Sequence, residues 1–264
     1  MKISIVTAAF NAARTLPDTL ESVARQTHTD IEHWLIDGAS ADATKDVVRR
    51  HGKHLSGFIS RPDKGLYDAM NKGARQSQGE VLAFLNADDW YASPEVLAKV
   101  AREFETGADL VYGDLAFVST HAPFSVSRVW RDSARDPLDF TRMGWHPAHP
   151  STFMRRELFL RLGGFDLRWR IAADYAFMAL AMQQRGLAIR HVPEVMVNMR
   201  LGGASTVNLR AVWRANRECV SALREMGAPH PRTTVALKLT RKLAQLQRWR
   251  LTQKAADLWR PWDP

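Results

Sequence analysis

The chain has 264 residues, of which 45% are hydrophobic and 25% are charged, and its formal net charge is +9. This composition is ordinary for a globular protein, and no apolar run approaches the ~18 residues of a membrane-spanning helix. The single cysteine, Cys219, excludes an internal disulfide and fits a reducing compartment.

Short apolar strands and amphipathic helices alternate through residues 1–115. The strands are expected at 2–10, 31–36, 55–60, 81–85 and 109–112, and the helices at 15–26, 43–50, 66–76 and 94–105. The apolar run at the start of the chain is too short for a secretory leader and is better explained as the first strand. Such alternation is typical of a mostly parallel sheet with helices on both faces, so we predict an α/β fold.

Acidic residues follow three of these strands. Asp37 and Asp63 lie beyond the second and third, and the buried strand in GEVLAFLNADDW (79–90) ends at Asp88 and Asp89. Adjacent carboxylates at such a place are costly without a counter-charge, and a hard divalent cation is the simplest one. An exposed turn is the alternative for this stretch alone. Ligands of open α/β sheets bind at this edge, so one active edge explains all three strands.

The pattern changes after residue 115. We expect short strand-like pieces in 116–130, helices at 155–162 and 172–185, a strand-like segment at 189–199 broken at Pro193, and helices from 207 with a break at 227–231. Residues 200–206 form a Gly-rich loop that can act as a lid. Arg200 and Ser205 border this loop, where a diphosphate contact and a solvated loop are both open.

The basic character of the chain is concentrated near its C-terminus. Residues 205–264 hold 12 Lys/Arg and 4 Asp/Glu, a net charge of +8, which leaves +1 for residues 1–204. Basic residues interleaved with Leu and Trp at 233–262 suit a helix on an anionic membrane surface. Packing of this region on the catalytic domain is the alternative. We expect no nucleic-acid partner, because the rest of the chain is nearly neutral and carries no nucleic-acid motif.

Six segments in order resemble the family 2 glycosyltransferases, which are nucleotide-sugar-dependent enzymes with a GT-A fold. The segments are SIVTAAFN (4–11), IDGASADAT (36–44), DKGLYDAMNKG (63–73), FLNADDW (84–90), GGFD (163–166) and AADY (172–175). The resemblance covers residues 2–206. It implies a GT-A domain at 1–206, with a nucleotide-binding half at 1–115 and an acceptor half at 116–206, followed by a basic helical region at 207–264.

The resemblance also implies roles for individual residues. The nucleobase would lie at the 7–10 loop, and a Mn²⁺ or Mg²⁺ ion on the diphosphate would be held by Asp88 and Asp89. Asp174 would be the catalytic base, which takes the proton of the acceptor hydroxyl. The residues implied in nucleotide binding are Thr7, Ala8, Ala9, Asn11, Asp37, Asp63, Lys64, Asp68, Asn86, Ala87 and Asp88. For Asp68, a first-turn helix acid is the alternative.

Two departures from the family pattern concern these acids. Asn86 stands where the leading acid of the metal motif is usual, which leaves open whether Asp88 or Asp89 binds the metal directly. Ala173 replaces the Glu that usually precedes the base. Asp174 alone could be a helix N-terminal acid. His146 and His149 are candidates for acceptor binding, loop contacts or structural roles, and the ligands near them are too few for a structural zinc site.

The sequence therefore predicts an inverting, metal-dependent glycosyltransferase with a nucleoside-diphosphate sugar, most simply a UDP-sugar, as donor. The expected acceptor is a saccharide or lipid-linked saccharide of cell-surface polysaccharide or glycolipid biosynthesis. The expected location is the cytoplasm, peripheral to the inner face of the plasma membrane. A catalytically silent nucleotide-sugar-binding module is one alternative, supported by the missing leading acid. A nucleotidyltransferase is another, but no Gly-rich phosphate loop follows the first strand.

Overall fold

Strands and helices alternate in the N-terminal half of the computed structural model, which describes residues 1–120, 125–131, 146–202 and 209–240. The elements are β1 (Ile3–Ala9), α1 (Leu16–Ala24), β2 (Ile31–Asp37), α2 (Thr44–His51), β3 (Gly57–Ser60), α3 (Leu66–Gln76), β4 (Val81–Phe84) and α4 (Val96–Glu105). Their bounds lie within two residues of those predicted from the sequence. The four strands are parallel to one another, which confirms the α/β prediction.

The second half adds shorter and antiparallel elements. They are β5 (Trp90–Tyr91), β6 (Leu110–Val118), β7 (Val126–Trp130), η1 (His149–Ser151), β8 (Thr152–Arg155), α6 (Arg156–Arg161), α7 (Ala173–Met182), β9 (Ile189–Arg200) and α8 (Leu209–Glu225). The strand predicted at 109–112 is too short, since β6 continues to Val118. The break predicted at Pro193 is a bulge in β9, because Gly113 pairs with Val192 and Asp114 with Val195.

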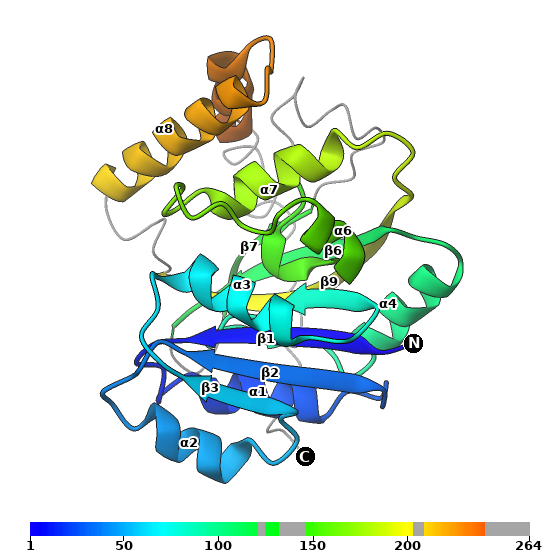
Figure 1. Cartoon of the computed structure of the whole chain (residues 1–264), viewed down its shortest axis with the longest axis vertical. Helices are drawn as coiled ribbons and strands as arrows, with labels where there is room; N and C mark the ends of the chain where they lie inside the picture. The colour runs from blue at the N-terminus through cyan, green and yellow to red at the C-terminus, as the bar shows by residue number, and fades with distance from the viewer. Residues whose placement is uncertain (121–124, 132–145, 203–208, 241–264) are drawn as a thin grey trace.

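All strands of the described chain join one mixed sheet in the order β3-β2-β1-β4-β8-β6-β9-β5, with β7 on β6 (Figure 1). β8 is antiparallel to both β4 and β6, so β6 points the same way as β4. The carboxyl ends of β1, β2, β3 and β4 therefore meet at one edge of the sheet. This edge is where ligands bind in open α/β folds.

Helices cover both faces of the sheet, and β4 shows this in its side chains. Leu82 and Phe84 belong to the core shared with α3, α6 and α7, whereas Val81 and Ala83 belong to the core shared with α4. Alternate side chains of a strand point to opposite faces. All four are buried, as expected for a strand covered on both sides.

The described part of the C-terminal region packs on the catalytic domain. α8 lies along α7 on the side away from the sheet (Figure 1), and Cys219, Leu223 and Val235 are buried in the same core as Met178. Residues 231–240 are helical. No helix among residues 1–120, 125–131, 146–202 and 209–240 is long and apolar enough to cross a membrane. Residues 241–262 of the predicted basic tail lie outside the described residues.

Candidate active site

Asp37 organises the loops that follow β1, β2 and β3. Its carboxylate is fully buried at the end of β2. It accepts hydrogen bonds from the Ser60 hydroxyl (2.6 Å), the Ser40 N–H (3.1 Å) and the Ser40 hydroxyl. The Ser40 hydroxyl also accepts the Asn11 N–H (2.8 Å). Asp37 therefore holds the loops at this edge of the sheet in place, and both of its carboxylate oxygens are occupied by hydrogen bonds from the protein.

The loop predicted at 7–10 is mostly strand, because β1 extends to Ala9 and its side chains are buried. Thr7 is fully buried and its hydroxyl bonds to the His33 ring (Nε2, 2.9 Å). Ala8 and Ala9 are buried in the core. Asn11 takes a left-handed conformation (φ 50°), and its side-chain oxygen accepts the N–H of residue 41 (3.0 Å). The side chains of these residues build the loop rather than line an open surface.

Phe10 is the exception, because 67% of its side chain is exposed. Gly38 shows what surrounds it: a Cβ at this position would lie 2.8 Å from Asp63 Oδ2 and 3.2 Å from Phe10 Cδ2. The Phe10 ring and the Asp63 carboxylate thus approach Gly38 so closely that a side chain there would displace one of them. Asp63 also accepts the Gly65 N–H through its other oxygen (2.8 Å).

Asp68 and Lys64 lie at the start of α3. Asp68 accepts the Lys64 N–H (2.9 Å) and pairs with the Lys72 ammonium (3.0 Å). Partial burial raises the pKa of Asp68, but these partners outweigh it and lower the pKa below its ordinary value. The Asp68 side chain thus closes the first turn of α3, as expected of a first-turn acid. The Lys64 side chain is exposed.

Asp88 and Asp89 have different surroundings at the end of β4. Asp89 is fully buried, and its carboxylate accepts the Arg200 N–H (3.3 Å) and the Asn86 amide (2.9 Å). Burial and the neighbouring Asp88 charge raise its pKa well above the ordinary value. Asp88 is half-buried, and burial raises its pKa too. Ala87 is buried between them and α1. Asp88 is thus the more accessible of the two carboxylates.

Arg200 holds this corner together from the end of β9. It is 5% exposed, pairs with Asp18 of α1, donates to the Asp88 carbonyl (2.5 Å) and lies over the Trp90 ring (4.6 Å). A solvated loop, one reading of Arg200 from the sequence, is therefore wrong. Ser205 lies outside the described residues. Burial also raises the pKa of Asp18, so one guanidinium faces three partly desolvated carboxylates.

Asp174 lies in the first turn of α7, within hydrogen-bond distance of the Tyr67 hydroxyl (3.0 Å). Its Oδ1 also accepts the Tyr175 N–H (2.8 Å), while Oδ2 has no hydrogen-bond partner in the described part of the chain. Tyr67 is in the first turn of α3, which begins just after the carboxyl end of β3. Asp174 is therefore at the same edge as the strand-end acids.

Two histidines, the buried His149 and the half-buried His146, lie near enough to this carboxylate to interact with its charge. His149 stacks on Phe84 of β4 (ring centroids 5.6 Å), and its Nε2 is buried without a hydrogen-bond partner among the residues described. His146 meets the Tyr175 ring edge-on (5.1 Å). Burial lowers the pKa of both, that of His146 to about 4, so both rings are neutral at pH 7. Within the described ranges, no three His, Cys, Asp or Glu side chains are grouped to hold a metal.

α8 supports the Asp174 helix, a contribution that the sequence did not indicate. Glu218 accepts the N–H groups of Ile171 (2.8 Å) and Ala172 (3.1 Å) at the start of α7. Lys238 lies over the Tyr175 ring (4.4 Å) and contacts the Cys219 sulfur (3.3 Å). The only sequence signal is that Glu218 is one of few acids in a basic segment.

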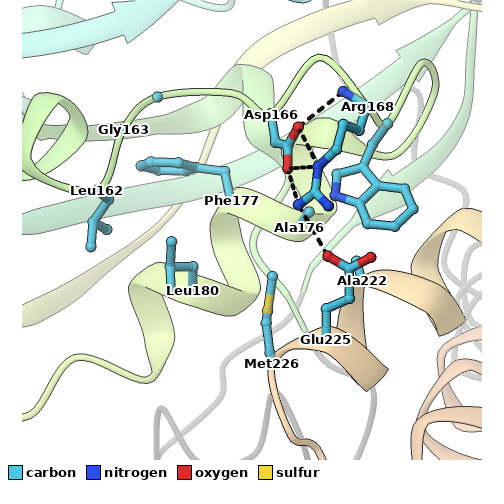
Figure 2. A pocket seen from close by; sticks show the side chains of 12 residues that line it. Leu162, Gly163, Asp166, Arg168, Ala176, Phe177, Leu180, Ala222, Glu225 and Met226 are labelled. Atoms are coloured by element: carbon cyan, nitrogen blue, oxygen red, sulfur yellow. Dashed lines mark hydrogen bonds and ion pairs between the residues drawn. The ribbon is translucent and has the colours of Figure 1, made fainter.

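A cavity of about 510 Å³ lies between the GGFD segment, α7 and α8 (Figure 2). Arg168 bridges Asp166 (2.6 Å) and Glu225 of α8 (3.0 Å) at its rim, as the dashed lines in Figure 2 show. None of the strand-end acids lines this cavity. It marks the seam between the catalytic domain and α8 rather than the nucleotide site.

The family model for glycosyl transferase family 2 matches residues 4–163. This chain belongs to glycosyltransferase family 2. PGL/p-HBAD biosynthesis glycosyltransferases of Mycobacterium bovis and Mycobacterium tuberculosis are 36% identical over 209 residues, which cover 76% of this chain and 78% of theirs. An uncharacterized glycosyltransferase of Nostoc sp. is 30% identical over 189 residues, which cover 66% of this chain and 57% of its own.

Solved structures show the same fold. S. aureus TarS 1–349 in complex with UDP-GlcNAc superposes with a TM-score of 0.69 at 16% identity, covering 96% of this chain and 76% of TarS. The mannosyltransferase PcManGT of Pyrobaculum calidifontis, in complex with GDP-Man and Mn²⁺, superposes with a TM-score of 0.62 at 19% identity, with the same coverage. The family 2 glycosyltransferase thus has the GT-A fold that its motifs predicted.

Proposed function

We propose that this family 2 glycosyltransferase transfers a sugar, with inversion, from a UDP-sugar to a saccharide or lipid-linked saccharide in cell-surface glycolipid or polysaccharide biosynthesis. The observation that carries the proposal is the position of Asp174. The Tyr67 hydroxyl holds it at the edge of the sheet where strands β1 to β4 end. A proton acceptor at the nucleotide edge is what a direct displacement requires.

The nucleotide is proposed to lie at the Phe10 edge. The exposed Phe10 ring offers a stacking surface for the base, worth about 1–3 kcal/mol where such stacking is measured. Asp63 is close enough to Gly38 to bind a polar edge of the base or the ribose. Buried Asp37 contributes indirectly, because its hydrogen bonds hold the loop that follows β2. The exposed Lys64 side chain is proposed to bind the phosphates. The UDP-GlcNAc complex of TarS supports a UDP-sugar donor.

The divalent ion is proposed to bind Asp88. Mg²⁺ and Mn²⁺ sites of this kind use one or two carboxylates and complete the shell with substrate phosphates and water. The donor set fits: Asp88 is accessible, and the side-chain oxygen of Asn86 is buried without a hydrogen-bond partner among the described residues. Asp89 is enclosed and orients the turn. When bound, the metal neutralises charge on the leaving diphosphate. The Mn²⁺ complex of PcManGT supports this assignment.

Asp174 is proposed as the base. Tyr67 and the Tyr175 N–H fix Oδ1, which leaves Oδ2 to accept the proton of the acceptor hydroxyl. The deprotonated oxygen of the acceptor attacks the anomeric carbon as the diphosphate leaves, so a single displacement inverts the configuration at this carbon. His146 and His149, whose rings lie near Asp174 and are neutral, are proposed as candidates for contacts to the acceptor.

The acceptor and location are proposed from the relatives and the charge distribution. The mycobacterial relatives are named for PGL/p-HBAD biosynthesis, which supports a glycolipid acceptor. A lipid-linked acceptor places the enzyme at the inner face of the plasma membrane, where the basic C-terminal region has an anionic partner. We also propose that the glycosyltransferase domain comprises residues 1–206 and that residues 207–264 form a separate basic helical region.

A thermal-melt panel with UDP, GDP, dTDP, CDP and ADP, each with and without Mn²⁺, tests the donor site, because a ligand of the native state raises the melting temperature. We expect a metal-dependent shift with UDP. Transfer from UDP-sugars to saccharide and lipid-linked saccharide acceptors is then measured by mass spectrometry. A metal-dependent shift without turnover on any acceptor would instead favour a silent nucleotide-sugar-binding module.

A further inference from the structure

The outer face of α8 is basic and carries an exposed tryptophan. Trp213 is 64% exposed, and the Arg217 guanidinium lies 5.4 Å from its ring centroid. Arg224 is also exposed and lies on the same face, about two helical turns beyond Arg217. α8 lies on the outside of α7, so this face is directed away from the catalytic domain (Figure 1).

This face contains a groove of about 480 Å³. Its lining residues come from α8 and from the start of the helix at 231–240: Trp213, Asn216, Arg217, Val220, Ser221, Arg224 and Arg232. Three of them are arginines and none is acidic. The groove therefore combines an aromatic side chain, a small apolar floor and guanidinium groups, a composition suited to an interfacial surface.

The acids of α8 do not offset this charge, because both are used on the other side. Glu218 binds the start of α7, and Glu225 pairs with Arg168 (3.0 Å). Arg214 is the arginine of α8 that pairs with Glu218 (3.3 Å). Both acids of α8 thus pair with groups outside the groove, whereas Arg217 and Arg224 line it.

The charge of the remaining chain argues against an internal occupant. Residues 241–264 contain six Lys/Arg and two Asp/Glu, so this segment is repelled by a basic groove. The catalytic portion, with a net charge of +1 over residues 1–204, does not extend the basic surface into the long track that a nucleic acid needs. A sheet of anionic head groups with an apolar layer beneath matches both arginines and tryptophan.

We propose that the groove formed by Trp213, Arg217, Arg224 and Arg232 is the docking surface for an anionic phospholipid bilayer. The arginines bind head-group phosphates, and the Trp213 ring enters the interface. This inference assigns a surface to the membrane partner proposed above. Vesicle binding is measured without sugar transfer, so the inference and the proposed reaction can fail separately.

The experiment is sedimentation of the full chain with phosphatidylcholine vesicles that contain or lack phosphatidylglycerol. We expect binding to the anionic vesicles only, weakened by salt. The Arg217→Glu/Arg224→Glu/Arg232→Glu variant is expected to lose vesicle affinity by about a hundredfold or more, because each basic residue near such a surface contributes about one kcal/mol. The triple change to Lys keeps the charge and is expected to bind nearly as the native chain does.

The matched control reverses three exposed cations at the end of α2: Arg49→Glu/Arg50→Glu/Lys53→Glu changes the net charge equally. It is expected to retain most vesicle binding. Melting temperature and the UDP-induced shift check the fold of each variant. If the α8 reversal does not fold, Trp213→Ala supplies the test, with an expected loss of about tenfold from the lost apolar burial.

Absence of binding to anionic vesicles would overturn the proposal. So would equal losses in the Arg217/Arg224/Arg232→Glu and α2 variants, or full binding by both the Arg217/Arg224/Arg232→Glu variant and Trp213→Ala. Tighter binding of a nucleic-acid oligonucleotide than of vesicles, through the same arginines, would assign the groove to that partner instead.

Discussion

Glu218 accepts the N–H of Ala172 (3.1 Å), which joins the C-terminal region to the start of the helix that carries Asp174. The same carboxylate oxygen accepts the Ile171 N–H (2.8 Å). These two N–H groups lie just before Ala173, the first residue of α7, so the carboxylate fixes the turn that leads into the helix, where a negative charge is also favoured by the helix dipole. The C-terminal region is thus bonded directly to the start of the helix that carries the proposed base.

Replacing Glu218 with Ala should lower both stability and turnover. Loss of a hydrogen bond to a charged group costs about 1.5–3 kcal/mol, which corresponds to a fall of several degrees in melting temperature for a chain of this size. We expect kcat to fall about tenfold, because Asp174 loses its fixed position, with little change in the donor KM. Glu218→Gln keeps an acceptor oxygen and should retain most activity. Equal kcat in Glu218→Ala and the native enzyme would show that the contact does not position the base.

Tyr67→Phe removes the contact to the proposed base, together with the hydrogen bond from the same hydroxyl to the Ile171 carbonyl (2.9 Å). Burial and the Asp174 charge raise the pKa of Tyr67 well above its ordinary value, so its hydroxyl remains a donor at neutral pH. Removing a hydrogen bond to a charged group costs about 1.5–3 kcal/mol, so we expect kcat to fall roughly ten- to a hundredfold with UDP binding unchanged.

Tyr91→Phe is the matched control for this change. The Tyr91 hydroxyl is equally buried but has no hydrogen-bond partner among the described residues. Its removal should leave kcat unchanged and keep or raise the melting temperature. A similar kcat for Tyr67→Phe and Tyr91→Phe would remove the role proposed for Tyr67.

Phe10→Ala tests the stacking surface. Because the ring is 67% exposed, its loss should change the melting temperature little. UDP affinity should fall by roughly five- to a hundredfold, the equivalent of ~1–3 kcal/mol of base stacking. Phe58→Ala, which removes another partly exposed ring (39%) from β3, serves as the control and should bind UDP normally. Unchanged UDP affinity in Phe10→Ala would place the base elsewhere.

Asp88 and Asp89 should separate in a metal titration. Asp88→Asn should abolish the Mn²⁺-dependent part of the UDP-induced melting shift. Asp89→Asn should retain it, because Asp89 is enclosed and the carbonyl oxygen of the new amide can still accept the Asn86 N–H. Loss of the metal response only in Asp89→Asn would reverse the assignment.

The metal response should also depend on pH. Burial raises the pKa of Asp88 above its ordinary 3.8, and a metal binds the ionised carboxylate. As pH falls through this raised pKa, protons displace the metal and the Mn²⁺-dependent shift shrinks. Without metal, the raised pKa means that the protonated form stabilises the fold at low pH, and that this contribution is lost as pH rises. A Mn²⁺-dependent shift of equal size from pH 7.5 down to pH 4 would contradict the assignment.

Local patterns were enough to predict the N-terminal half. Alternating apolar runs and turn residues placed α3 at 66–76 as observed, because strand and helix periodicity act within a few residues. The inward position of Arg200 was not predictable, since its partners Asp18 and Asp88 are over a hundred residues away.

The same limit applies to the roles of individual acids. The sequence placed Asp37, Asp88 and Asp89 at the correct edge but could not show which are enclosed, because burial depends on β9 and on Ser40 and Ser60. Glu218 and Tyr67 reach α7 only through tertiary packing, and no local pattern marks either contact.

The central claim is that Asp174 is the base of a metal-dependent transfer, and Asp174→Asn tests it most directly. The amide keeps the size of the side chain but cannot take a proton at neutral pH. Sugar transfer and the Mn²⁺–UDP melting shift are measured on the same preparation. We expect kcat to fall by about a hundredfold to ten-thousandfold, while the UDP-induced shift in melting temperature stays unchanged. Transfer at the native rate would contradict it and return Asp174 to the role of a helix N-terminal acid.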